Sequence, residues 1–109
     1  AIRNGYSNLL TETIATFVFM MAILFIQKGD VKLGSLDALP VALLVLGVGL
    51  SMGGPTGYAI NPARDLGPRI MHAVLPIPGK GHSDWKYAWI PVAGPILGAC
   101  LASIVYRLL

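Results

Sequence analysis

The chain contains three long apolar stretches separated by shorter polar segments. The first extends from about residue 9 to residue 26 and ends at Gln27-Lys28-Gly29-Asp30. The second covers about residues 38–52, and the third covers about residues 87–106 and ends at Arg107. A transmembrane helix needs about 20 consecutive, mostly apolar residues. The pattern therefore predicts three membrane-spanning helices and an all-α membrane protein.

The second apolar stretch carries a signal for a helix start and a signal for a break. Asp37 is placed to cap the helix, and Pro40 falls in the first turn, where proline is tolerated. Gly53-Gly54-Pro55 follows, and this composition ends a helix. Non-helical backbone survives at membrane depth only where it is buried in protein or lines water. We therefore expect a re-entrant loop from about residue 53.

The most informative segment is Asn61-Pro62-Ala63-Arg64-Asp65. Residues 38–63 contain no charged side chain, and Arg64 and Asp65 then follow directly. Polar and charged groups are costly at membrane depth, so they face a cavity, a partner or a pathway. Asn is a good N-cap and Pro suits the first helical position. The segment therefore predicts a half-helix over about residues 62–75, with its positive dipole end inside the protein. That helix is too short to span the bilayer.

A polar loop from Pro76 to Asp84 follows, and Trp85, Tyr87 and Trp89 then suggest an aromatic belt at the interface. Three crossings place the two termini on opposite sides of the membrane. A half-helix that enters from one face needs a counterpart from the other face, as inverted repeats supply in many transport proteins. The chain lacks an initiator Met and a signal-peptide pattern, so we interpret it as a segment of a longer protein.

Composition agrees with a membrane protein. Of the 109 residues, 55% are hydrophobic and only 12% are charged, whereas soluble domains carry about 25% charged residues. The net charge of +3 is small and the basic residues are scattered, which argues against nucleic acid as a partner. Cys100 is the single cysteine, and His72 and His82 are isolated. We therefore expect no disulfide within the chain, no metal site, no cofactor and no role for either histidine.

The segment from Gly57 to Arg69 closely resembles the second Asn-Pro-Ala loop of the major intrinsic protein (aquaporin) family, in particular its glycerol facilitator branch. The Thr11-Glu12-Thr13 start of the first span and the Gly94-Pro95 pair of the last span fit as well. An isolated Asn-Pro-Ala triplet is weak evidence, but here Arg-Asp follows it inside a glycine-broken apolar stretch. The resemblance implies that residues 1–109 form the carboxy-terminal half of an aquaporin-like inverted-repeat bundle.

The resemblance also implies roles for individual residues. Asn61 of the Asn61-Pro62-Ala63 motif would donate its side-chain amide into a pore, and the dipole of the half-helix would disfavour protons and cations. The backbone would add a ladder of carbonyl acceptors for solute hydroxyls. These carbonyls belong to Thr56, Gly57, Tyr58 and Ala59.

A selectivity filter of Gly49, Tyr58 and Arg64 is implied in the same way. Gly49 leaves room where water-selective members carry a histidine, Tyr58 offers a flat apolar wall, and Arg64 donates from its guanidinium fork. Asp65, which is typical of the glycerol branch, would support the site by pairing with Arg64 or with Arg69. Tyr58 replaces the phenylalanine that is common in that branch.

Two further features have a structural and a functional interpretation. Glu12 lies inside the first span and either braces the re-entrant loop or sits among lipid headgroups; we favour the brace, because acids in the membrane are rarely idle. Gly94, Gly98 and Ala102 recur every four residues, and such a small-residue face indicates close helix packing rather than a ligand site.

These observations predict a multi-pass protein of the cell membrane that is not an enzyme. It would act as a passive channel for glycerol and other small uncharged solutes, including water. Its partners would be the lipid bilayer, an amino-terminal half of the channel and, by family analogy, the other subunits of a homotetramer. The alternatives are a mainly water-selective channel, against which Gly49 argues, and a half-length fragment that transports nothing by itself.

Overall fold

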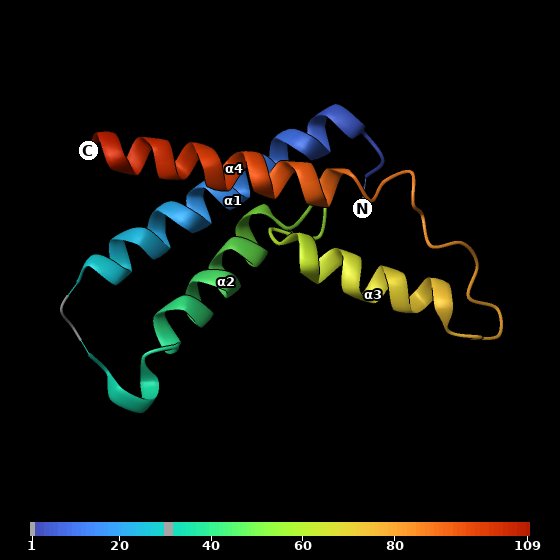
Figure 1. The fold of residues 1–109 in the computed structure, drawn as a ribbon, viewed down its shortest axis with the longest axis horizontal. Coiled ribbons are helices and arrows are strands. Elements are labelled where there is room, and N and C mark those ends of the chain that lie inside the picture. Colours follow the sequence, from blue (N-terminus) through green and yellow to red (C-terminus); the bar gives the residue numbers. More distant parts are fainter. Residues whose placement is uncertain (1, 30–31) are drawn as a thin grey trace.

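The structure is a computed structural model that describes residues 2–29 and 32–109. It contains the helices α1 (Gly5–Lys28), α2 (Leu39–Met52), α3 (Pro62–Val74) and α4 (Ile90–Leu108), and a short 3₁₀ helix, η1 (Gly34–Leu36). Figure 1 shows α1 and α4 crossing at the top of the molecule, with α2 and α3 diverging below them. Asp30, at the expected end of the first span, and Val31 lie outside the described residues.

Among the described residues, three helical segments are long and apolar enough to cross a membrane: Gly5–Lys28, Gly34–Met52 and Ile90–Leu108. Large apolar side chains such as Leu43, Leu46 and Leu50 face outward from α2. In water such a surface would be unusual, but in a bilayer it contacts lipid or another helix. The predicted all-helical fold with three spans is therefore confirmed.

α1 and α4 pack closely through the predicted face of small residues. A Cβ atom built on Gly94 would lie 2.6 Å from Cβ of Glu12, and one built on Gly98 would lie 2.9 Å from the backbone nitrogen of Phe17. Ala102, one turn further along, is completely buried. The packing interpretation of these three positions is confirmed, because any larger side chain would separate the two backbones.

The expected cap of the second span is wrong. α2 has Ala38 at its N-cap position without a side-chain hydrogen bond. The Asp37 carboxylate instead accepts a hydrogen bond of 2.6 Å from the backbone N–H of Leu33. The reason is local: the 3₁₀ turn over residues 34–36 precedes α2, and Asp37 closes that turn rather than starting the next helix.

The outer two spans also begin elsewhere than the apolar pattern suggests. α1 begins at Gly5, before the expected residue 9, because the Asn4 side chain caps it by accepting from the Ser7 amide at 3.1 Å. α4 begins at Ile90, after the expected residue 87, because residues 85–89 form turns. Hydrophobicity locates the apolar stretch, whereas polar caps and turns set the helix ends.

The re-entrant segment connects α2 to α3 without regular structure. The backbone of Gly57, Tyr58 and Ile60 has positive φ values of 80°, 44° and 41°. Left-handed backbone is unusual for a tyrosine and strained for a β-branched isoleucine. The chain can hold this conformation only if neighbouring groups fix it, which directs attention to the contacts of residues 57–60.

Candidate functional site

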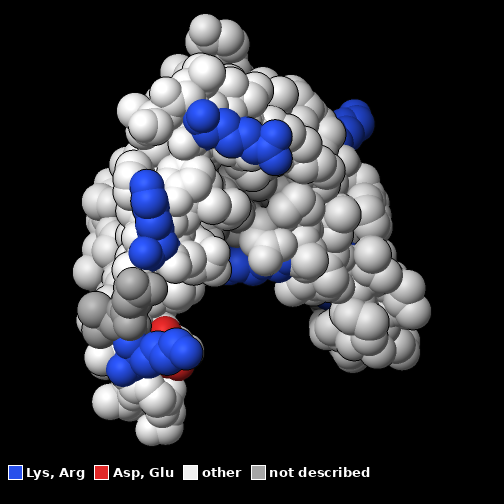
Figure 2. Space-filling view, turned by 60° about the vertical axis from the view of Figure 1, so that its left-hand side comes forward, with Lys and Arg blue, Asp and Glu red and all other residues white. Residues whose placement is uncertain are grey.

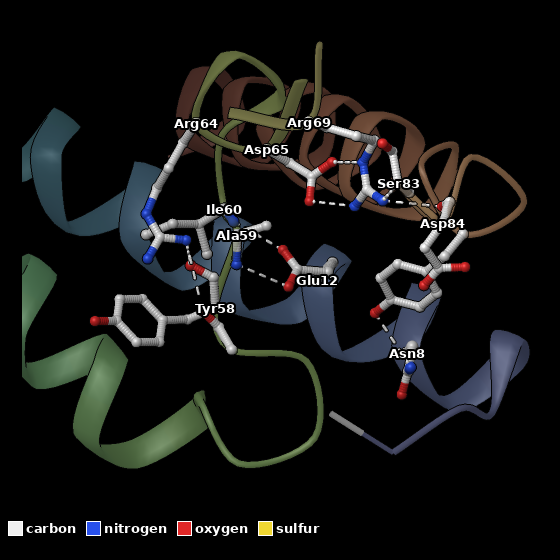
Figure 3. Close-up of polar contacts among 12 residues, drawn as sticks. Asn8, Glu12, Tyr58, Ala59, Ile60, Arg64, Asp65, Arg69, Ser83 and Asp84 are labelled. Atoms are coloured by element: carbon white, nitrogen blue, oxygen red, sulfur yellow. Dashed lines mark hydrogen bonds and ion pairs between the residues drawn. The ribbon is translucent and has the colours of Figure 1, made fainter. Parts of the chain in front are cut away.

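Glu12 holds the re-entrant loop. Its side chain lies in α1 and is only 1% exposed, and its two carboxylate oxygens accept from the backbone N–H groups of Ala59 (2.9 Å) and Ile60 (2.8 Å). Figure 3 shows the carboxylate facing the backbone of Ala59 and Ile60 in the loop. A buried carboxylate is tolerated when hydrogen bonds satisfy it, and bonds to an ionised acceptor are strong ones. The strained backbone at Ile60 and the buried acid thus stabilise each other.

Arg64 lies beside the carbonyl oxygens of the same loop. Its Nη1 donates to the Tyr58 carbonyl at 2.9 Å and to the Gly57 carbonyl at a long 3.5 Å. Thr56 contributes its hydroxyl, which accepts from the Tyr58 N–H at 3.2 Å. Because Glu12 turns the amides of residues 59 and 60 to one side, the loop presents carbonyls of residues 57 and 58 towards Arg64.

Asn61 caps the half-helix α3. Its backbone is extended, and its Oδ1 accepts from the Ala63 N–H at 2.9 Å, directly before Pro62 at the first helical position. The side-chain oxygen is therefore engaged in the cap, while the amide NH₂ keeps two donors. The Asn61 side chain is exposed at this helix end.

Gly49, Tyr58 and Arg64 form one cluster. The Arg64 guanidinium carbon lies 4.7 Å from the centre of the Tyr58 ring, within cation–π distance. A Cβ atom built on Gly49 would lie 2.8 Å from Cζ of Tyr58, and one on Gly53 would lie 2.7 Å from Cδ1. The Tyr58 ring thus packs directly against Gly49, and only a residue without a side chain leaves room for the ring there.

Asp65 pairs with Arg69, which settles the choice that the sequence left open. The two side chains form a bidentate ion pair with both N–O distances at 2.7 Å. Residues four apart lie on the same face of a helix, whereas adjacent residues point in different directions. Arg69 Nη1 also donates to the backbone carbonyls of Ser83 (2.7 Å) and Asp84 (2.9 Å), and so ties α3 to the following loop.

A second polar group, which the sequence analysis missed, lies beside the loop carrying Asp84. Arg3 forms an ion pair of 2.6 Å with Asp84 and covers the Tyr87 ring at 4.3 Å from its centre. The fully buried Asn8 donates to the Tyr87 hydroxyl at 3.2 Å. Burial raises the pKa of the Tyr87 phenol. The available signal was the spacing of Asn8 and Glu12, two polar residues four apart on one helix face.

An open cavity of about 370 Å³ lies between α3 and the loop after it. It is polar and mostly charged, and Arg64 forms part of its wall. Its lining consists of Arg3, Arg64, Asp65, Pro68, Arg69, His72, His82, Ser83 and Asp84. Among the residues that the structure describes, no group of His, Cys, Asp and Glu could hold a metal ion.

Charge is sparse on the outer surface. Figure 2 shows one face, on which basic side chains stand apart from one another and one of them lies beside an acidic side chain. The rest of this face is mostly uncharged and arches around a hollow. Scattered cations on an apolar surface suit a bilayer with polar headgroups at its edges.

The fold and the site together define a multi-pass helical membrane protein with a re-entrant loop and a half-helix. The chain belongs to the major intrinsic protein family, because the sequence model of that family matches residues 2–106. Members of this family are channels of the cell membrane and are not enzymes. The predicted family, fold and localisation are thereby confirmed. No solved structure matches the chain.

Several relatives of the chain are glycerol uptake facilitator proteins. The chain is 54% identical to the glycerol uptake facilitator protein of Streptococcus pneumoniae over 99% of its own length and 46% of the relative. It is 55% identical to the glycerol uptake facilitator protein of Bacillus subtilis over 98% of its length and 39% of the relative. A D/L-lactic acid transporter of Lactiplantibacillus plantarum is 45% identical over 94% of the chain and 43% of the relative. The chain thus spans less than half of each of these relatives.

Proposed function

We propose that residues 1–109 form the carboxy-terminal half of a passive channel for glycerol and other small uncharged solutes, including water. The observation that carries this proposal is the cluster of Gly49, Tyr58 and Arg64 beside the Asn61 cap. It combines an apolar wall with hydrogen-bond donors in the space of a few ångströms. The similarity to glycerol uptake facilitators supports the same assignment.

The solute would exchange its hydration shell for groups on this chain. Arg64 and the Asn61 amide donate to hydroxyl oxygens, while carbonyls of residues 56–59 accept from hydroxyl hydrogens. The Tyr58 ring contacts the carbon atoms of a polyol. The Arg64 charge and the positive end of the α3 dipole repel cations and protons. A small uncharged solute with hydroxyls along one side meets these requirements.

A complete pore needs a second half-helix. Asn61 and Arg64 are exposed here, although a membrane would place them where unsatisfied polar groups are costly. An amino-terminal half related by inverted repeat would enclose them. We therefore propose an amino-terminal half as the direct partner and a homotetramer as the assembly, with the bilayer around it.

Liposome shrink–swell kinetics test this function. The chain is reconstituted alone and together with the amino-terminal half of the S. pneumoniae relative, and glycerol and water permeabilities are compared with those of empty liposomes. We expect rapid glycerol flux from the paired halves. Water flux without glycerol flux would favour the water-selective alternative. If the chain alone gives no flux and the pair does, the chain is half of a pore. If neither gives flux, the proposal is overturned.

Arg64→Ala in the paired form tests the filter. It is expected to admit larger polyols and to weaken ion exclusion, because the guanidinium fork no longer narrows the path. Arg107→Ala, at the far end of α4, removes the same charge away from the site and serves as the control. Equal selectivity in both variants would remove Arg64 from the filter.

A further inference from the structure

The cavity beside Arg64 is lined by more positively charged than negatively charged side chains. Arg69 spends its donors on Asp65 and on the carbonyls of Ser83 and Asp84. Arg3 pairs with Asp84. Three arginines against two aspartates leave one positive charge in the lining, and both acids are paired with arginines other than Arg64.

Arg64 is the arginine of this cavity that donates to neutral groups. Its Nη1 donates to the carbonyls of Tyr58 and Gly57, and among the described residues no carboxylate forms an ion pair with its guanidinium group. A guanidinium presents five N–H donors in a fork that fits a carboxylate through two parallel hydrogen bonds. The Arg64 side chain is exposed and forms part of the cavity wall.

We propose that this cavity binds a small monocarboxylate anion at Arg64, in the mouth through which a polyol must pass. A single negative charge matches the single excess positive charge. A doubly charged oxyanion would meet the carboxylates of Asp65 and Asp84 as well. The bound anion would occupy the donors that a polyol needs and would thus compete with it.

His72 lies in α3 at the wall of the cavity, and its Nδ1 lies 2.9 Å from the Ser83 hydroxyl. This contact holds the imidazole ring against the loop that follows α3. Together with the Arg69 contacts to Ser83 and Asp84, it gives the cavity a fixed polar wall.

Saturation-transfer NMR on the methyl protons of acetate tests the proposal in nanodiscs that contain the chain together with the amino-terminal half of the S. pneumoniae relative. We expect saturable binding that glycerol displaces. Arg64→Gln should weaken the affinity about tenfold, because a charge-assisted bidentate contact is lost. Arg107→Gln, the matched control, should leave the affinity unchanged.

Three outcomes would overturn the site: no saturable acetate binding, equal losses in Arg64→Gln and Arg107→Gln, or sulfate binding more tightly than acetate. Arg64→Lys separates charge from geometry, since it keeps the cation but loses the fork.

The inference uses the same Arg64 mouth as the proposed function, but its readout is independent of flux. Acetate binding without glycerol flux from the paired halves would support the site and sink the channel function. Glycerol flux without acetate binding would do the reverse.

Discussion

Ile60 and Glu12 illustrate how single residues decide this site. Isoleucine rarely adopts a φ of 41°, and a buried glutamate is costly without partners. Here the Ile60 N–H donates to the Glu12 carboxylate, and the Ala59 N–H donates to the second oxygen. Each residue would be unfavourable alone. Together they fix the direction in which the loop carbonyls point.

Gly49→Ala is expected to destabilise the protein by about 1–3 kcal/mol, since the new methyl group would overlap the Tyr58 ring and overpacking has a cost of this size. The measurement is the free energy of unfolding in detergent. Gly47→Ala is the matched control, because a Cβ atom there meets nothing within 4 Å. If both variants unfold at the same denaturant concentration as the wild type, Tyr58 is not held against α2.

At the scale of secondary structure elements, the close packing of α1 against α4 supports the site. α1 and α4 approach so closely that Gly98 leaves no space for a side chain, and Glu12 is covered where Gly94 passes it. Small residues permit this approach, and van der Waals contact then stabilises the pair in the bilayer. The two helices form the rigid support from which Glu12 reaches the re-entrant loop.

Gly98→Ala should therefore force α1 and α4 apart. A methyl group at that position would overlap the Thr13 carbonyl oxygen and lie 2.9 Å from Cβ of Thr16. We expect a loss of about 1–3 kcal/mol in unfolding free energy and faster hydrogen exchange at the Ala59 and Ile60 amides, because their acceptor Glu12 moves. Cys100→Ala, an exposed change on the same helix, should show neither effect. Unchanged exchange in Gly98→Ala would uncouple the helix pair from the loop.

At the scale of the whole molecule, polar contacts join the amino-terminal residues to segments far along the chain. Arg3 near the amino terminus pairs with Asp84 in the loop before α4, and the Ile2 N–H donates to the Pro55 carbonyl at 3.0 Å. Figure 1 places the amino terminus near the start of α4, while the carboxy terminus lies at the far end of that helix. We therefore expect residues 2–4 and 76–84 on one side of the membrane and residues 34–36 on the other.

Cysteine labelling tests that arrangement without any transport assay. In a Cys100→Ala background, Ser35→Cys and His82→Cys should react with a membrane-impermeant maleimide from opposite sides of sealed vesicles. Ser35 lies in the turn before α2 and His82 lies in the loop after α3. Labelling of both from the same side would contradict the three crossings.

Much of the fold followed from the sequence by itself. Long apolar stretches can be stable in a bilayer only as helices, because every backbone polar group must be satisfied there. The glycine-rich break and the Asn61-Pro62 cap fixed the re-entrant loop and α3 for equally local reasons. The packing face of α4 could be predicted, because small residues that recur every four positions lie on one helix face and allow a neighbouring helix to approach closely. Asp37 was misread because a short 3₁₀ turn competed for its carboxylate.

Tertiary structure alone decided which polar side chains meet. The sequence analysis left Arg64 and Arg69 open as partners of Asp65, although the spacing of four residues on α3 favours Arg69. Only the folded chain shows that the carbonyls of Ser83 and Asp84 hold Arg69 from the other side. The sequence analysis gave no sign that Arg3 and Asn8 converge on Tyr87, which lies far along the chain. Local chemistry determines helices, caps and breaks, since each depends on near neighbours. The cavity at Arg64 depends on contacts between distant segments, which only the folded chain brings together.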